Sequence, residues 1–258
     1  MERGMIKTLL FDLGGTLHTV RRTQESRLRF CAHLIRILEQ HGIPVTLTPQ
    51  ELDAMLTVNG EEYKHFGERS LIELPQSVIW SRYNLKELHI DEARLAPFAE
   101  EMSFYYDQER MENVPRPRLK ETMAALHGMG IRLGVVSNII STTLVPYALK
   151  EYGIEAYMEC VVMSSQVGIR KPDPRIFEIA MNQMHASAME TGYVGDTISR
   201  DVLGSRNAGL GLCVRIENPS IAHRDVAFQG PDAPRADYVI RELPELIPIL
   251  SKINGPRA

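Results

Sequence analysis

Cysteine is scarce in this sequence of 258 residues and is never paired in a recognisable motif. The three cysteines, Cys31, Cys160 and Cys213, are odd in number and far apart in the chain. This spacing argues against a disulfide framework and suits reduced thiols in the cytoplasm. We therefore expect a cytoplasmic protein whose cysteines serve packing.

Long hydrophobic runs and a strong charge of one sign are also missing. No apolar stretch reaches the length of a membrane-spanning helix, and residues 1–7 are too short and too mixed in charge for a secretory signal. The formal net charge of -4 gives no electrostatic reason to bind nucleic acid or an anionic membrane. A small molecule is the expected partner, and the oligomeric state stays open.

Zinc motifs are absent as well. The eight histidines form neither a His-Glu-x-x-His motif nor a tight cluster with cysteine. Any metal ion must therefore be held by oxygen atoms, which are the ligands that magnesium prefers. The composition, with 44% hydrophobic and 24% charged residues, is that of a globular protein, and its length fits an α/β core with one insertion.

The chain does contain a regular alternation of short apolar segments and helical segments. Residues 6–11 predict a buried first strand, which ends in the turn Asp12-Leu13-Gly14-Gly15-Thr16. From residue 119 onward the alternation implies right-handed βαβ units and a parallel sheet. We predict further strands at residues 132–136, 160–163, 193–194, 212–216 and 238–240. Helices are predicted from Leu119 to Gly128 or Gly130, after Pro174, up to Gly209 and at 243–253. The predicted fold class is α/β, a Rossmann-like parallel sheet with helices on both faces plus an inserted helical cap domain.

The insertion after the first strand shows helical patterns alone. Its first helix is indicated by apolar residues at helical spacing, namely Leu28, Cys31, Leu34, Ile35 and Leu38. Thr48-Pro49-Gln50-Glu51 has the pattern of a capping box that opens a second helix, and further helices are predicted near 78–88 and 91–106. The proline-rich segment 113–117 predicts a stiff connector back to the α/β pattern. We predict an α/β core of residues 1–20 and 112–258 and a helical cap of residues 21–111.

Four loops that follow or adjoin predicted strands carry polar residues of complementary kinds. These loops are residues 12–16, Ser137-Asn138, Arg170-Lys171-Pro172-Asp173, and Gly195-Asp196 with Asp201 beyond it. Ligands of open α/β sheets bind at the carboxyl ends of the strands, so the four loops predict one site. Carboxylates that converge there repel one another unless a cation lies between them, and oxygen ligands favour Mg²⁺.

The order of these four loops resembles the haloacid dehalogenase (HAD) superfamily over residues 11–209. The resemblance implies a magnesium-dependent hydrolase, a phosphatase acting on a small phosphorylated metabolite, in which Asp12 forms an aspartyl-phosphate. Such an intermediate divides one difficult hydrolysis into two easier steps. The long segment between the first and second loops resembles the family's helical cap of the type inserted after the first motif, which selects substrates and excludes water.

The resemblance also implies a role for each loop residue. Asp12 is the nucleophile, and with Asp196 and the backbone carbonyl of Gly14 it holds Mg²⁺. The remaining residues implied for the site are Ser137 and the Asn138 amide as ligands of phosphate oxygens, Lys171 as a catalytic and phosphate-binding cation, and Asp201 as a support for the metal or for Lys171.

Residue 14 departs from the family's phosphatase pattern. The family places a second aspartate there, which protonates the leaving alcohol and later activates water, whereas this chain has glycine. Such an acid typically contributes about 10²–10⁴-fold in rate. Three explanations stay open: slow activity on activated esters, an acid from another residue, or binding of phosphometabolites with weak or no catalysis. His18 is the nearest titratable candidate, and a solvated histidine at the cap hinge is its plainer interpretation.

Other assignments are less favoured. The turn at residues 12–16 also resembles the phosphate loop of sugar kinases with the actin-like ATPase fold, but that fold leaves Lys171, Asp196 and Asp201 unexplained. A metal-free dehalogenase would not need Asp196 followed by Asp201. Asp173 before Pro174 is interpreted as a helix N-cap.

Two further groups of residues are given structural roles. Arg21 and Arg22 are interpreted as an exposed basic pair, although they lie where an anionic substrate would enter. A helical stripe of apolar residues is assigned to packing within the insertion, namely Phe98, Met102, Tyr105 and Tyr106.

Overall fold

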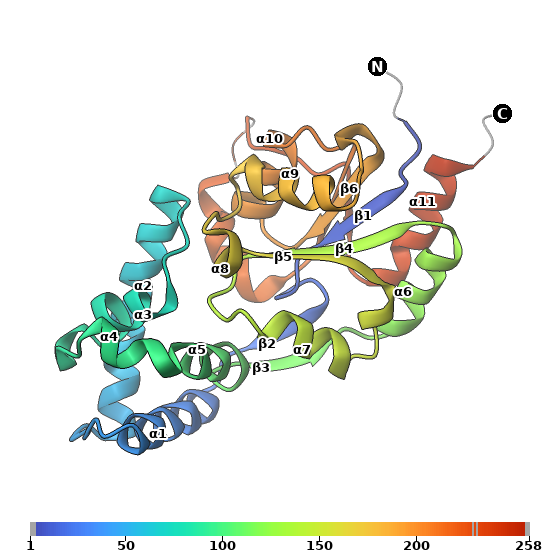
Figure 1. The fold of residues 1–258 in the computed structure, drawn as a ribbon. Coiled ribbons are helices and arrows are strands. Elements are labelled where there is room, and N and C mark those ends of the chain that lie inside the picture. Colours follow the sequence, from blue (N-terminus) through green and yellow to red (C-terminus); the bar gives the residue numbers. More distant parts are fainter. Residues whose placement is uncertain (1–3, 229, 231, 256–258) are drawn as a thin grey trace.

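The computed structural model describes residues 4–228, 230 and 232–255, so the outermost residues of the predicted core, 1–3 and 256–258, lie outside the described residues. Figure 1 shows an α/β unit that contains the first and last described segments of the chain, with a helical unit beside it. Among the helices in the described ranges, none combines the length and apolar character needed to cross a bilayer. The three cysteines are free and buried, as packing residues should be.

The α/β unit is built on a parallel sheet of six strands. In spatial order these are β5 (Met158–Met163), β4 (Arg132–Ser137), β1 (Thr8–Phe11), β6 (Thr191–Gly195), β7 (Leu212–Ile216) and β8 (Tyr238–Ile240). All four residues of β1 are buried, because a central parallel strand is covered on both faces. The predicted parallel sheet is confirmed, and Asp12 follows one of its central strands.

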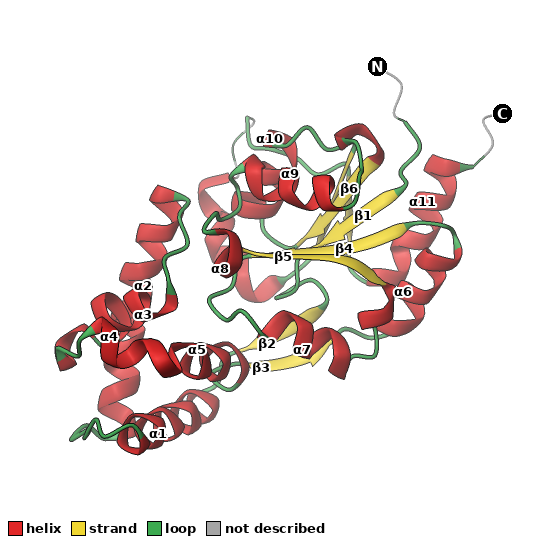
Figure 2. Ribbon diagram, viewed as in Figure 1, coloured by secondary structure: helices red, strands yellow, loops and turns green. Residues whose placement is uncertain are grey.

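Helices cover both faces of this sheet, as predicted (Figure 2). Side chains of β1 alternate between the two layers: Leu9 and Phe11 join one apolar cluster, and Leu10 joins the other. The helices of this unit are α6 (Leu119–Gly128), α7 (Leu144–Glu151), α8 (Ser164–Val167), α9 (Pro174–Gln183), α10 (Leu203–Asn207) and α11 (Leu246–Asn254). The first cluster includes residues of α6, α7 and α11, and the second includes residues of α9. Sequence reasoning did not predict α7.

The inserted helical unit has an apolar core of its own. Its helices are α1 (Gln24–Gln40), α2 (Pro49–Ser70), α3 (Gln76–Ile79), α4 (Glu92–Leu95) and α5 (Ala99–Gln108). The capping box predicted at Thr48 is present, with Glu51 as its partner. The predicted packing stripe is confirmed as well, because Met102 and Phe98 are buried in the insertion's core and Tyr105 and Tyr106 pack against it.

The last helices of the insertion are more broken than the sequence predicted. The expected helix over residues 78–88 is divided into α3, a π-helical turn at Trp80–Asn84 and a 3-10 turn at Lys86–Leu88. The helix expected over residues 91–106 is interrupted by a 3-10 turn at Ala96–Phe98. Pro97 explains this interruption, since it lacks the backbone N–H that an α-helix needs.

A two-stranded antiparallel ribbon joins the insertion to the sheet. It consists of β2 (His18–Arg21) and β3 (Glu112–Pro115), which lie side by side in Figure 2. Arg21 pairs with Glu112 in this ribbon. The sequence predicted a stiff connector at residues 113–117 but not its strand pairing: the chain is extended at Glu112–Pro115 because it pairs with β2. Proline is tolerated because Pro115 lies at the last position of an edge strand.

Candidate active site

The turn after β1 brings the first and last polar loops into contact. Gly15 has a φ of +89°, and a Cβ on it would lie 1.9 Å from Oδ2 of Asp196. Only glycine fits this left-handed and crowded position. The turn therefore allows Asp12, at the end of β1, to lie beside Asp196, at the end of β6.

Lys171 is the centre of a buried polar network. Its Nζ donates hydrogen bonds to Asp12 Oδ1 (2.8 Å), Asp201 Oδ1 (2.8 Å) and Tyr193 Oη (2.7 Å). Burial alone would lower the pKa of Lys171, but the carboxylates of Asp12 and Asp201 outweigh burial and raise it. The ammonium group therefore stays charged beside Asp12.

Asp201 lies behind this lysine. One carboxylate oxygen accepts from Lys171 and Tyr193, and the other accepts from the backbone N–H (2.9 Å) and the hydroxyl (2.5 Å) of Thr197. Burial alone would raise the pKa of Asp201, but Lys171 and Arg200 hold it below its usual range. Both oxygens are thus occupied by protein donors.

Asp196 has a different environment. Its Oδ2 accepts from Asn218 Nδ2 (2.7 Å), whereas its buried Oδ1 has no hydrogen-bond partner in the part of the chain that the structure describes. Carboxylate oxygens of Asp12, Asp196 and Asp201 lie within 4.8 Å of one another. Burial raises the pKa of Asp12, against the influence of Lys171, and raises the pKa of Asp196 to about 7. The three carboxylates are therefore crowded, and that of Asp196 is incompletely paired.

Ser137 and Asn138 follow β4 at the same edge of the sheet. The Asn138 side chain joins two loops, because its Oδ1 accepts from the Lys171 N–H (2.8 Å) and its Nδ2 donates to the Lys171 carbonyl (3.0 Å). A cavity of about 670 Å³ lies over this edge. Six of the predicted site residues line it, namely Asp12, Gly14, Ser137, Asn138, Lys171 and Asp196, whereas Asp201 lies beneath.

The prediction that His18 is a solvated hinge residue was wrong. His18 is 3% exposed, because the ribbon and the end of α7 enclose it. Its Nδ1 lies 2.8 Å from the hydroxyl of Tyr152, and its Nε2 lies 3.7 Å from the position that a Cβ on Gly14 would occupy. Burial, with a contribution from Arg116, lowers the pKa of His18 to about 4. A neutral imidazole thus faces the space where the expected side chain of residue 14 is missing.

Several residues of this site carry no signal in the sequence. Arg116 donates to the Gly15 carbonyl (2.6 Å) and to the Glu217 carbonyl (3.2 Å), although the sequence marks only a proline-rich connector there. Asn218 holds Asp196 from an irregular segment that follows β7. Arg200 lines the cavity next to Asp201, and the nearby carboxylates outweigh its burial and raise its pKa.

Three residues have the structural roles that the sequence predicted for them. Asp173 is the N-cap of α9 and accepts from the Arg175 N–H (2.9 Å), as predicted. Arg21 and Arg22 are exposed, as predicted, and they also line the cavity.

The doubly covered parallel sheet, with a buried lysine between Asp12 and Asp201 at its edge, has the α/β architecture of the haloacid dehalogenase type. A family model described as haloacid dehalogenase-like hydrolase matches residues 6–209. The chain belongs to this family, as its four loops predicted.

Relatives with similar sequences carry phosphatase names. A glyceraldehyde 3-phosphate phosphatase of Methanopyrus kandleri is 29% identical over 213 residues, which cover 82% of this chain and 84% of the relative. A phosphoglycolate phosphatase of Agrobacterium fabrum is 28% identical over 96% of this chain and 94% of its own. A solved structure of a 2-haloacid dehalogenase of Pseudomonas syringae has a TM-score of 0.63 at 22% identity, with 96% of this chain and 99% of that chain covered. This last likeness concerns the fold alone.

Proposed function

We propose that this chain is a magnesium-dependent phosphatase that hydrolyses a small phosphorylated metabolite through an aspartyl-phosphate on Asp12. The observation that carries the proposal is the contact of Asp12 with Lys171 beside the unpaired oxygen of Asp196. The names of the relatives from Methanopyrus kandleri and Agrobacterium fabrum, which specify small phosphorylated metabolites, support the substrate class. We include a cytoplasmic location in this proposal, since all three cysteines are free.

Asp12 has the surroundings of a nucleophile. It lies at the end of a rigid central strand, and the Lys171 ammonium favours its ionised form. In the first step a carboxylate oxygen of Asp12 forms a bond to phosphorus while the ester bond to the leaving alcohol breaks. In the second step water attacks that phosphorus, which releases inorganic phosphate and regenerates the carboxylate.

The carboxylate pair fits a hard divalent cation. Asp196 Oδ1 is buried without a partner among the described residues. Burial raises the pKa values of both Asp12 and Asp196. A bound divalent cation would stabilise the ionised form of both carboxylates. Asp12, Asp196 and the Gly14 carbonyl would hold Mg²⁺, whereas the oxygens of Asp201 are already occupied. When bound, Mg²⁺ neutralises charge on the transferring phosphoryl group.

Phosphate oxygens would be held by donors at the end of β4. The Ser137 hydroxyl and the Asn138 backbone amide lie at the cavity with the Lys171 ammonium. These donors are held in place before substrate arrives, because the Asn138 side chain is bonded to the Lys171 backbone. Asp201 acts through Lys171, whose ammonium it fixes beside Asp12.

Residue 14 provides no acid for the first step, and His18 does not replace it as an acid. A neutral imidazole with a pKa of about 4 has no proton to give as an imidazolium at neutral pH. It can accept a proton from water in the second step, because its Nε2 lies next to the position that a side chain on residue 14 would occupy. Neither residue therefore supplies a proton to the leaving alcohol.

The helical insertion of residues 21–111 acts as the cap in this proposal. Insertion residues such as Asp107 and Met111 line the same cavity as Asp12, and the organic part of a substrate would lie against them. Selectivity should therefore reside in the insertion.

A panel of phosphate esters, measured with Mg²⁺ and with excess chelator, tests the proposal. We expect turnover that requires the divalent ion, with aryl phosphates as the best substrates. The competing function, binding of phosphometabolites without catalysis, is motivated by Gly14. It is favoured if phosphometabolites bind with micromolar affinity while no ester in the panel turns over.

A further inference from the structure

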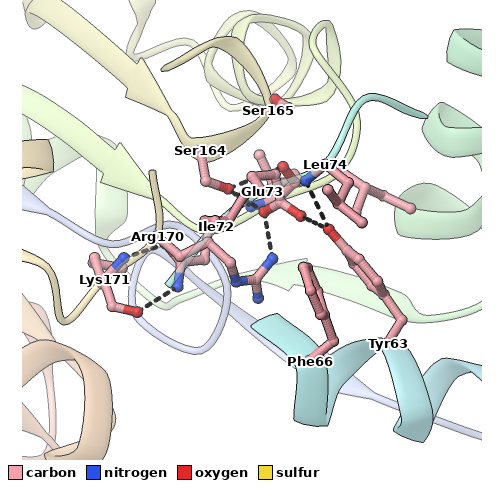
Figure 3. A network of polar contacts seen from close by, with 12 residues as sticks. Tyr63, Phe66, Ile72, Glu73, Leu74, Ser164, Ser165, Arg170 and Lys171 are labelled. Atoms are coloured by element: carbon pink, nitrogen blue, oxygen red, sulfur yellow. Dashed lines mark hydrogen bonds and ion pairs between the residues drawn. The ribbon is translucent and has the colours of Figure 1, made fainter. Parts of the chain in front are cut away.

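One buried carboxylate of the cap reaches into the core close to the site. Glu73 lies between α2 and α3, and its side chain is 0% exposed. Figure 3 shows it among Tyr63 of the cap and Ser164 and Arg170 of the core. Its carboxylate forms an ion pair with Arg170 and accepts hydrogen bonds from the Tyr63 hydroxyl and the Ser164 hydroxyl (2.5 Å).

The backbone around Glu73 is also joined to the core. The Glu73 N–H donates to the Gly168 carbonyl (3.0 Å), and the Arg170 N–H donates to the Leu71 carbonyl (3.0 Å). Between these bonds, Ile72 and Ile169 form an isolated antiparallel bridge. The segment of the cap that carries Glu73 is therefore seated on the core segment that leads into Lys171.

Through its core partners, Glu73 contacts both loops that hold the phosphate-binding groups. The Ser164 hydroxyl donates to Glu73 and accepts from the Ile139 N–H (2.9 Å), the residue after Asn138. Arg170 immediately precedes Lys171 in the chain. Asn138 and Lys171 are in turn bonded to each other by two hydrogen bonds. A single cap carboxylate thus adjoins the two loops that would bind phosphate.

A buried carboxylate is costly unless its partners are all in place. The Glu73 carboxylate has all three of its side-chain partners only while the cap is seated on the core. Tyr63 comes from the cap, whereas Ser164 and Arg170 come from the core. Glu100 contacts the core differently. It accepts bonds from Ser141, Thr142 and Thr143, which follow Ile139 in the chain, and has no bond to Arg170 or Ser164.

We propose that Glu73 is a positioning residue, through which seating of the cap fixes the loops of Asn138 and Lys171 in their catalytic geometry. The inference rests on the proposed phosphatase activity for its kinetic consequence. Its structural consequence, that these loops loosen when Glu73 loses its charge, holds for the protein without substrate or metal.

Glu73→Gln tests this proposal, because the amide keeps the shape of the side chain but loses the ion pair with Arg170. Hydrogen exchange in the metal-free protein reports on the loops through the amides of Ile139 and Lys171. We expect their exchange to accelerate at least about tenfold. With Mg²⁺ and p-nitrophenyl phosphate we expect kcat to fall at least about tenfold while KM changes less than about threefold, because positioning matters most in the transition state.

Two variants control for a purely structural effect. Tyr63→Phe removes a partner of Glu73 that contacts neither phosphate-binding loop, and it should give the same pattern at smaller size. Glu100→Gln removes another contact between cap and core and should leave both amides and kcat within about twofold of wild type. Unchanged amide exchange in Glu73→Gln, or a kcat within twofold of wild type, overturns the proposal. If wild type hydrolyses no ester at all, the phosphatase proposal fails, and amide exchange still decides the role of Glu73.

Discussion

At the scale of single residues, Gly14 has the largest consequence for the chemistry. A general acid protonates the leaving oxygen, so that the group departs as an alcohol and not as an alkoxide. The absence of the acid therefore matters most for poor leaving groups. The space next to Gly14 is open: a Cβ there would have its nearest contact, 3.7 Å, with His18 Nε2. A carboxylate at residue 14 can therefore be introduced without a steric clash at Cβ.

The first prediction concerns the leaving group. Wild type should hydrolyse p-nitrophenyl phosphate far better than glycerol 3-phosphate, because nitrophenolate departs without a proton. Gly14→Asp should raise turnover of the alkyl ester, by at most about 10²–10⁴-fold, and change aryl turnover much less. Steady-state kinetics of both esters with both proteins measure this.

Fast hydrolysis of alkyl esters by wild type would contradict the prediction and would mean that an acid is already in place. His18→Gln tests the separate role of His18 as a base, with Tyr152→Phe as its control, since the Tyr152 hydroxyl contacts Nδ1 of His18 and not Nε2. A base role for His18 predicts that His18→Gln slows hydrolysis of the phosphoenzyme and leaves its formation unchanged.

The second prediction concerns Asp196 and pH. Its folded pKa of about 7 lies above the ordinary value of 3.8, so the metal-free folded state binds this proton more tightly than the unfolded state. The contribution of Asp196 to the free energy of unfolding of the metal-free protein therefore falls as pH rises from about 4 to about 7. Because Mg²⁺ needs the deprotonated carboxylate, saturating Mg²⁺ should raise Tm more at pH 8 than at pH 5.

Thermal unfolding of wild type and Asp196→Asn, each with and without MgCl₂ at the two pH values, measures this. The amide variant should gain little from Mg²⁺ at either pH. An equal gain in wild type at pH 5 and pH 8 would show that proton and metal do not compete at this carboxylate.

At the scale of elements, local patterns in the sequence identified the strands and the loops that follow them. Short apolar segments located β4 and β7, and glycines marked the turn after Asp12, because each of these signals lies within a few neighbouring residues. Strand ends of a parallel sheet meet at one edge, so Asp12, Ser137 and Asp196 could be expected to converge.

Contacts between distant segments could not be predicted in the same way. The ribbon of β2 and β3 has short and partly exposed strands, and its pairing joins residues more than ninety positions apart, such as Arg21 and Glu112. The burial of His18 follows from that pairing and from Tyr152 on another element. Glu73 and Arg170 are likewise ordinary charged residues in sequence, and only the seating of the cap brings them together.

At the scale of the whole molecule, the insertion and the α/β unit have separate apolar cores. The insertion packs around Trp80 and Met102, whereas the α/β unit packs on both faces of its sheet. Arg21 and Glu112 lie opposite each other where the chain leaves and re-enters the ribbon. This geometry supports the proposed division into a core and a cap at residues 21–111.

The third prediction follows from that division. Replacing residues 22–111 by a two-residue hairpin turn should leave a core that unfolds cooperatively, because the linker joins residues already paired in the ribbon. Turnover should fall, since Glu73 is lost, and preferences among phosphate esters should flatten. Thermal unfolding and the ester panel measure these effects. A truncated chain without a cooperative transition would contradict the division.

The most direct test of the central claim is the capture of phosphate on Asp12. The protein with Mg²⁺ is mixed with a phosphate ester labelled in its phosphoryl group, quenched in acid within milliseconds and digested, and the label is located by mass spectrometry. The account predicts an acyl phosphate on the peptide that contains Asp12. It also predicts no label and no turnover for Asp12→Asn, with an unchanged fold, because an amide cannot act as the nucleophile. Undiminished turnover by Asp12→Asn, or label on another residue, would contradict it.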